Sequence, residues 1–346
     1  MLMIFNDTAE KTRAKVIGMY AVLIAFNIAA WLWALAEFHD SPLLLGTAFL
    51  AYSFGLRHAF DADHIAAIDN VTRKLMQEGR RPIAVGFFFS LGHSTIVIAL
   101  AVAIALTTAA LKDHFETFKS VGGLIGTTVS ALFLLAIAAA NILVFVQVYR
   151  AFQTVKKGGN LVEEDVDTLL SKRGFLGRFF GSLFRLIEHS RQMYPLGVLF
   201  GLGFDTATEV GLLGISAAQA SQGMPMWSIL VFPALFTAGM SLMDTTDSTL
   251  MVGAYGWAFV KPIRKLYYNM TITLVSVIAA LVIGGLEALN LIGDKFALQG
   301  AFWEFIGAVN DNFGLVGYGI VAFFIVSWIV SFLVYKARGY DSLEVA

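Results

Sequence analysis

The sequence predicts an all-α polytopic membrane protein with eight transmembrane helices. Apolar residues make up 58% of the 346 residues, and charged residues make up 14%. The apolar residues form long runs that are separated by polar connections, a pattern typical of helical membrane proteins. The net charge of -1 argues against a nucleic-acid-binding protein, and the lack of cysteine excludes disulfides and thiolate metal sites.

Eight apolar runs are each long enough to cross a bilayer, which needs about 20 residues. Their approximate bounds are 16–37, 43–69, 82–109, 121–149, 194–218, 226–253, 269–291 and 313–335. The first run exceeds the apolar segment of a secretory signal, so we expect it to be retained as a helix. The second and fourth exceed a straight crossing, which predicts tilt or an interruption near Gly55.

The basic residues predict that both termini lie in the cytoplasm. Twenty Lys and Arg residues fall on the side of the termini and the even-numbered connections. The opposite side holds only Lys112, Lys119 and Lys295, and Arg57 lies within a predicted span. This bias is the positive-inside pattern.

Three segments follow from the runs: a first transmembrane half over 1–149, a cytoplasmic connector over 150–193 and a second half over 194–346. The connector contains an acidic group at 163–167, which is typical of a solvated loop. Its basic, Phe-rich stretch over 172–185 is expected to lie along the membrane surface.

Short motifs recur between the two halves. FGL at 54–56 returns at 200–202, and GHS at 92–94 is matched by GMS at 239–241. The equivalent spans are two with five and three with six, so the copies run in opposite directions. An inverted repeat of this kind is typical of secondary transporters, whose substrate site lies near the membrane midplane.

A cluster of polar residues interrupts the second run: Arg57, His58, Asp61, Asp63 and His64. Each charge near the bilayer centre costs about 2.5–3.5 kcal/mol, so the cluster needs a partner, and a divalent cation suits imidazole and carboxylate together. In a continuous helix His58, Asp61 and His64 share one face. Asp63 then has its own partner, such as Arg57, or the helix is unwound and all four side chains converge.

Other polar residues in the runs extend this prediction. His93 lies between Gly92 and Ser94, and these small residues allow its helix to approach the cluster closely. Asp69 has two interpretations, a transport role or a carboxylate at the cytoplasmic helix end that faces Arg73.

The second half contributes four carboxylates at helical spacing. Asp205 and Glu209 form one pair, and Asp244 and Asp247 form the other. Neighbouring Thr and Ser hydroxyls compensate poorly for carboxylates in hydrocarbon surroundings. A cation path or a proton-sharing relay explains them better.

The ligand types predict a borderline transition ion, because imidazole suits nickel, cobalt, zinc, copper and iron. Chemistry alone leaves nickel, cobalt and zinc open. Histidine must be neutral to bind, so uptake should fall as the external pH drops through about 6.5.

Four motifs resemble those of the nickel/cobalt transporter family: HAFDADHI at 58–65, LGHS at 91–94, LGFDTATE at 202–209 and GMSLMDTTDS at 239–248. The resemblance covers essentially the whole chain and is strongest to the hydrogenase-associated high-affinity nickel permeases. It implies secondary import of Ni²⁺, with Co²⁺ as another substrate, by a multi-pass protein of the bacterial inner membrane. The functional residues that it implies are His58, Asp61, Asp63, His64, His93, Asp205, Glu209, Asp244 and Asp247. Ser248 stands where the family commonly has glycine.

The alternatives are a membrane-embedded metalloenzyme, a transporter of another divalent ion such as Zn²⁺, and a metal sensor or channel. An enzyme is disfavoured because the chain has six histidines, of which His39, His114 and His189 lie outside the runs, and it lacks an HExxH motif. No phosphate-binding loop ending in GKS or GKT occurs either, so neither a nucleotide nor another cofactor is expected, and the metal ion is the substrate.

Overall fold

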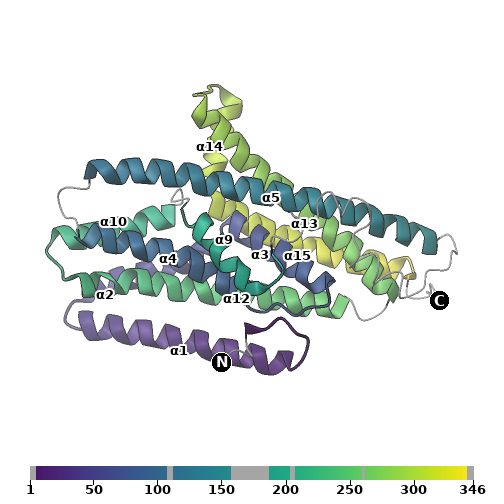
Figure 1. Cartoon of the computed structure of the whole chain (residues 1–346), viewed down its shortest axis with the longest axis horizontal. Helices are drawn as coiled ribbons and strands as arrows, with labels where there is room; N and C mark the ends of the chain where they lie inside the picture. Colours follow the sequence, from purple (N-terminus) through teal and green to yellow (C-terminus); the bar gives the residue numbers. More distant parts are fainter. Residues whose placement is uncertain (1–4, 107–111, 157–186, 203–206, 259–261, 341–346) are drawn as a thin grey trace.

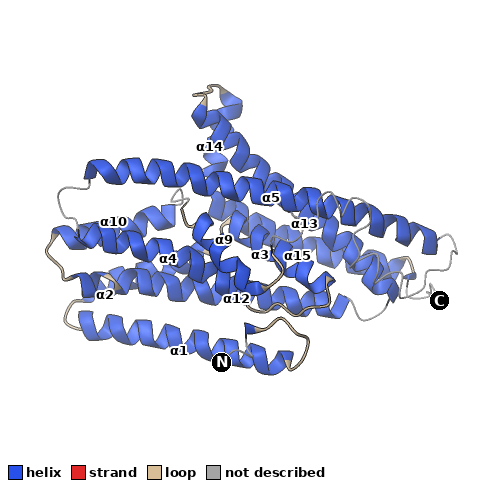
Figure 2. Cartoon of the chain, viewed as in Figure 1, coloured by secondary structure: helices blue, strands red, loops and turns tan. Residues whose placement is uncertain are grey.

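The computed structural model describes residues 5–106, 112–156, 187–202, 207–258 and 262–340 (Figure 1). Within these ranges every regular element is a helix, and no strand occurs (Figure 2). The helices are α1 (Thr12–Phe38), α2 (Pro42–His58), α3 (Ala62–Gln77), α4 (Val85–Leu106), α5 (Lys112–Lys156), the 3₁₀ turn η2 (Ser190–Gln192), α9 (Met193–Phe200), α10 (Ala207–Ser221), α11 (Met226–Ile229), α12 (Val231–Ala258), α13 (Pro262–Lys295), α14 (Ala301–Asn310) and α15 (Phe313–Ala337).

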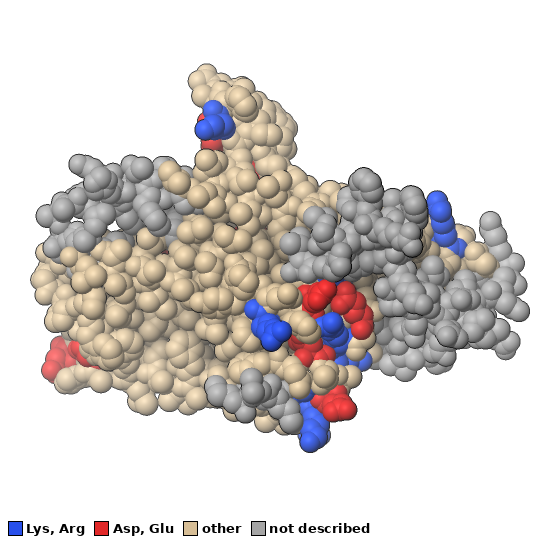
Figure 3. Space-filling model, in the orientation of Figure 1, with Lys and Arg blue, Asp and Glu red and all other residues tan. Residues whose placement is uncertain are grey.

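Among the described residues, six helical segments are long and apolar enough to cross a membrane, which confirms the prediction of an all-helical, multi-pass protein. They are Thr12–Phe38, Val85–Ala103, Leu124–Thr154, Met226–Gly256, Leu266–Lys295 and Phe313–Ala337. Many large apolar side chains on α1, α13 and α15 are exposed. On the face in Figure 3, charged side chains form a few separate groups with a broad uncharged area between them. Such a surface suits contact with lipid.

The other two predicted crossings, the second and the fifth, are each divided into shorter helices. α2 ends at His58, and α3 begins at Ala62 after Asp61, whose backbone is extended. α9 ends at Phe200, and α10 begins at Ala207. The interruption predicted near Gly55 therefore occurs one turn later.

α3 continues to Gln77, eight residues beyond the predicted end of the second run. Of the two interpretations of Asp69, the position at a helix end is wrong, because Asp69 lies in the middle of α3 and is fully buried, although it does interact electrostatically with Arg73. Polar contacts with α13 allow this buried helix to extend past the apolar run: Arg73 donates to Ser276 and Thr273.

Close backbone contact joins α2 to α12. A Cβ at Gly55 would lie 2.1 Å from the carbonyl oxygen of Phe236, and a Cβ at Gly239 would lie 2.8 Å from the carbonyl oxygen of Tyr52. Both separations are far below ordinary contact, so these positions accept only glycine without movement of a helix. Gly55 therefore serves helix packing and does not break α2.

The contact between α4 and α9 has the same form. A Cβ at Gly92 would lie 2.0 Å from the carbonyl oxygen of Tyr194, and a Cβ at Gly197 would lie 2.1 Å from that of Phe89. These two close crossings form the centre of the bundle, while α1 and α5 lie along its opposite edges (Figure 1).

Most of the predicted connector lies outside the described residues. α5 extends to Lys156, and the chain is described again from Ile187 before η2. The acidic group at 163–167 and the basic stretch at 172–185 both fall within 157–186, which the structure does not describe.

Candidate metal site

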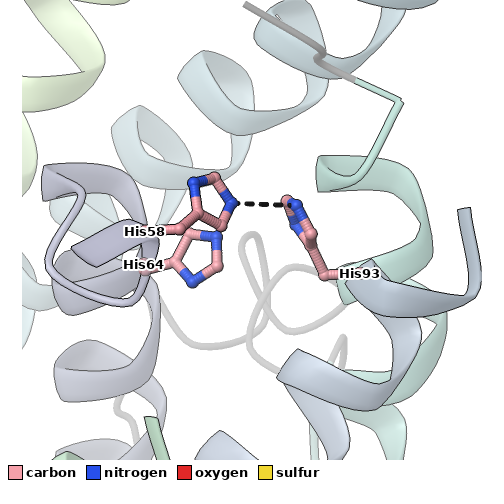
Figure 4. Close-up of side chains that lie close together, drawn as sticks. All are labelled: His58, His64 and His93. Carbon is pink, nitrogen blue, oxygen red and sulfur yellow. Dashed lines mark hydrogen bonds between the residues drawn. The ribbon is translucent and has the colours of Figure 1, made fainter. Parts of the chain in front are cut away.

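Three buried imidazoles meet at the centre of the bundle (Figure 4). His58 is the last residue of α2, His64 lies in the first turn of α3, and His93 is in α4. One ring nitrogen from each lies within 4.8 Å of the other two. The Nε2 atoms of His58 and His93 are 3.0 Å apart. The three side chains can therefore face one small cation.

The interruption between α2 and α3 makes this arrangement possible. Six residues of a continuous helix would separate His58 and His64 by a rise of about 9 Å. In the interrupted chain their ring centroids are 4.6 Å apart. The helix is therefore unwound between His58 and His64, as one of the two predicted geometries requires, whereas the convergence of Asp63 with the other side chains stays a prediction.

A carboxylate lies beside each imidazole. Asp61 Oδ2 is 2.8 Å from His58 Nδ1, and Asp244 Oδ2 is 3.4 Å from His64 Nδ1. Glu209 Oε1 is 2.7 Å from His93 Nε2. Carboxylates in such positions orient a metal-binding imidazole and raise its basicity, or themselves become ligands.

Glu209 has a second relation to the cluster, because the same Oε1 lies 3.9 Å from His58 Nε2. Thr208 Oγ1 is 3.2 Å from His58 Nδ1. We expected Thr208, like the other hydroxyls of this segment, only as a partner for carboxylates, so its contact with an imidazole was not predicted. Nothing in its position next to Glu209 in the sequence indicates this contact.

Two ring nitrogens of the cluster, His64 Nε2 and His93 Nδ1, are buried without a hydrogen-bond partner among the described residues. A buried polar atom without a partner costs about 1–3 kcal/mol. Imidazole nitrogens with nearby carboxylates suit a borderline transition ion, and the residues present therefore fit the predicted metal site.

Asp63 lies close enough to His58 to interact with it electrostatically, and it also contacts the backbone of α3. It lies in the first turn of α3 and is partly exposed, and its Oδ1 accepts a hydrogen bond of 2.9 Å from the backbone N–H of His64. This hydrogen bond satisfies one of the backbone N–H groups that have no helical partner in the first turn of α3, and it helps to position His64.

Arg57 and Asp61 border a small cavity that lies on the side of Asp61 away from the imidazoles. The cavity has a volume of about 20 Å³, enough for one water-sized occupant, and Asp311 also lines it. Arg57 and Asp311 are exposed, whereas Asp61 is buried. Asp61 therefore lies between the imidazoles and the surface. The sequence did not single out Asp311, which follows α14 with no distinguishing motif.

The carboxylates of the second half take three different places. Glu209 and Asp244 contact the imidazoles, Asp247 lies one turn further along α12, and Asp205 lies outside the described residues. The hydroxyls of Thr245 and Thr246 bond to backbone carbonyls one turn earlier in α12. The Thr246 hydroxyl also accepts a hydrogen bond of 3.0 Å from Tyr20 of α1.

Comparisons with known proteins identify the family of the chain. Residues 44–334 match the family described as "High-affinity nickel-transport protein". The chain belongs to this family. It is 62% identical over 339 residues to the "High-affinity nickel transport protein" of Cupriavidus necator, which covers 98% of this chain and 97% of that protein.

Two more distant relatives match almost as completely. The "High-affinity nickel-transport protein NixA" of Helicobacter pylori is 40% identical, with 94% of this chain and 98% of that protein covered. The "Cobalt transport protein NhlF" of Rhodococcus rhodochrous is 38% identical, with 94% and 92% covered. No solved structure matches the chain. The resemblance that the motifs indicated is confirmed at the level of the family.

Proposed function

We propose that this member of the high-affinity nickel-transport family imports Ni²⁺, and Co²⁺ as a second substrate, across the bacterial inner membrane. The observation that carries the proposal is the buried group of three imidazole nitrogens within 4.8 Å of one another, inside an apolar helical bundle. Imidazole ligands suit both ions. The relatives named for nickel and for cobalt support the same substrate pair.

In this proposal His58, His64 and His93 bind the ion, and Asp61 assists from beside His58. Asp63 acts through the position of His64. The other predicted path residues are Arg57, Asp69, Asp205, Glu209, Asp244 and Asp247. Glu209 and Asp244 accept the partly dehydrated ion next to the imidazoles, which their short distances support.

The proposed topology has eight crossings and cytoplasmic termini, with halves over 1–149 and 194–346 joined by the connector over 150–193. The six apolar spans supply six crossings, and α2 with α3 and α9 with α10 supply the other two. Discontinuous helices at a midplane site are common in secondary transporters.

An inverted repeat is supported by the two glycine crossings, because α2 packs on α12 as α9 packs on α4. In these contacts Gly55 corresponds to Gly197, and Gly239 to Gly92. The motif comparison instead pairs Gly55 with Gly201, one helical turn later. The proposed repeat therefore follows the packing register and not the recurring FGL letters.

The membrane potential provides a driving force without a nucleotide or cofactor. An inside-negative potential of 100 mV favours entry of a divalent ion by about 4.6 kcal/mol, at about 2.3 kcal/mol per charge. The nickel ion is the transported substrate, and the proposal includes no enzymatic step.

The test is uptake of radiolabelled nickel into proteoliposomes at an imposed potential, with cobalt, zinc and manganese as competitors. His64→Ala should abolish saturable uptake, whereas His39→Ala should retain it, because the His39 side chain is 68% exposed outside the cluster. Equal uptake by His64→Ala and the native chain would overturn the site. Absence of uptake for every metal by the folded native chain would overturn the function.

A further inference from the structure

A second polar cluster lies beyond the imidazoles on the same two helices. His64 of α3 faces Asp244 of α12, and further along Tyr255 of α12 donates to Asp69 of α3. The two helices therefore run in the same direction at this place. Asp69 lies five residues beyond His64, a rise of about 7.5 Å toward the C-terminal ends of both helices.

Two carboxylates of this cluster each keep an unpaired oxygen. Asp69 is fully buried, and its carboxylate accepts hydrogen bonds from Tyr255 and Ser276, while its Oδ2 has no hydrogen bond of ordinary length in the described part of the chain. Asp247 Oδ2 is likewise buried without a partner there. The two carboxylates are close enough to interact electrostatically.

A buried guanidinium near Asp69 donates hydrogen bonds to neutral side chains. Arg73 follows Asp69 by one helical turn, and it donates to Ser276, Thr273 and Asn70. Arg73 influences Asp69 electrostatically, but one guanidinium offsets only one of two carboxylates. A cation that binds both unpaired oxygens would supply the missing compensation.

Space for a partly hydrated ion adjoins these groups. Asp247 and Tyr255 border a cavity of about 370 Å³ between α12, α13 and α15, whose other lining is mainly apolar. A water molecule occupies about 30 Å³ in the liquid, so the cavity has room for several.

We propose that Asp69, Asp247 and Tyr255 form an inner cation site that receives the ion from the imidazole cluster. The inner site offers oxygen ligands only, and its cargo is a partly hydrated divalent cation. Nickel prefers imidazole to such ligands, so the ion is held less tightly here and can leave toward the cytoplasm. This inference rests on the proposed function.

The inner site is tested by a pair of measurements on the full chain. The first is nickel affinity by equilibrium dialysis, and the second is uptake into proteoliposomes. Asp69→Asn should leave the affinity of the imidazole cluster within about twofold and lower the maximal uptake rate at least tenfold. Asp40→Asn, at a carboxylate 90% exposed beyond α1, should change neither. A native uptake rate in Asp69→Asn, or an equal loss of affinity and uptake, would overturn the inner site.

Manganese gives a readout that does not depend on nickel transport, because Mn²⁺ prefers oxygen ligands. Electron paramagnetic resonance should detect Mn²⁺ bound to the native chain and to His64→Ala, with binding at least tenfold weaker in Asp69→Asn. If Asp69→Asn does not fold, Tyr255→Phe replaces it, with at least threefold weaker Mn²⁺ binding expected. Unchanged Mn²⁺ binding in these variants would refute the inner site. If the native chain binds Mn²⁺ here but takes up no nickel, the proposed function fails separately.

Discussion

Gly92→Ala should disrupt the nickel site although it adds only one methyl group. The added Cβ would lie 2.0 Å from the carbonyl oxygen of Tyr194, whereas ordinary contact begins at 3.4 Å. α4 and α9 would have to separate by about 1.4 Å. His93 is the next residue, and a metal ligand tolerates a displacement of only about 0.2 Å.

Two quantities follow from this displacement. Overpacking of this kind costs about 1–3 kcal/mol of folding free energy. Loss of one imidazole from the cluster should weaken nickel binding at least tenfold, or about 1.4 kcal/mol. The expected result is therefore a lower unfolding temperature together with weaker nickel affinity.

The assay is thermal unfolding and equilibrium nickel binding of the purified chain in detergent. Gly46→Ala in α2 is the matched control, because a Cβ at position 46 meets no described atom within 4 Å. The control should be neutral or slightly more stable, since alanine favours helix over glycine. If Gly92→Ala matched this control in both measurements, the argument from close helix packing would be refuted.

Three further variants separate binding, stability and access. Glu209→Gln should weaken nickel affinity about 10–100-fold in a competition assay, because Glu209 lies 2.7 Å from an imidazole nitrogen of the cluster; unchanged affinity would contradict this role. Ser130→Ala should lower the unfolding free energy by about 1–3 kcal/mol, because Ser130 Oγ lies 2.8 Å from both oxygens of buried Glu287. A large rise in the KM for nickel would instead link this pair to transport. Asp311→Asn should slow uptake at low nickel concentration and low ionic strength while leaving the equilibrium affinity unchanged, because Asp311 borders the cavity beside Asp61. If the variant and the native chain took up nickel at equal rates at both low and high ionic strength, this entry route would be contradicted.

Residue types predicted the composition of the site better than its geometry. His58, His64 and His93 were expected together and do meet, because polar side chains within apolar spans have few other places to lie. Glu209 and Asp244 were expected along a path, but each lies next to a particular imidazole. Asp63 was grouped with the ligands; it lies near His58 and also accepts a hydrogen bond from the backbone N–H of His64, and its role as a ligand stays a prediction. No spacing rule distinguishes these outcomes, because they depend on which helices are neighbours.

The sequence by itself determined the helical membrane class, since runs of about 20 apolar residues must satisfy their backbone hydrogen bonds internally in lipid. It also limited the ligand chemistry, because the absence of cysteine excludes thiolate and leaves imidazole, oxygen and thioether donors. Only the tertiary structure decided which donors share a site. The interruption after His58 and the close helix contacts at glycine bring α2, α3, α4 and α12 together. At each of these glycines the two backbones in contact are more than 100 residues apart in the chain, so local sequence does not determine the contact.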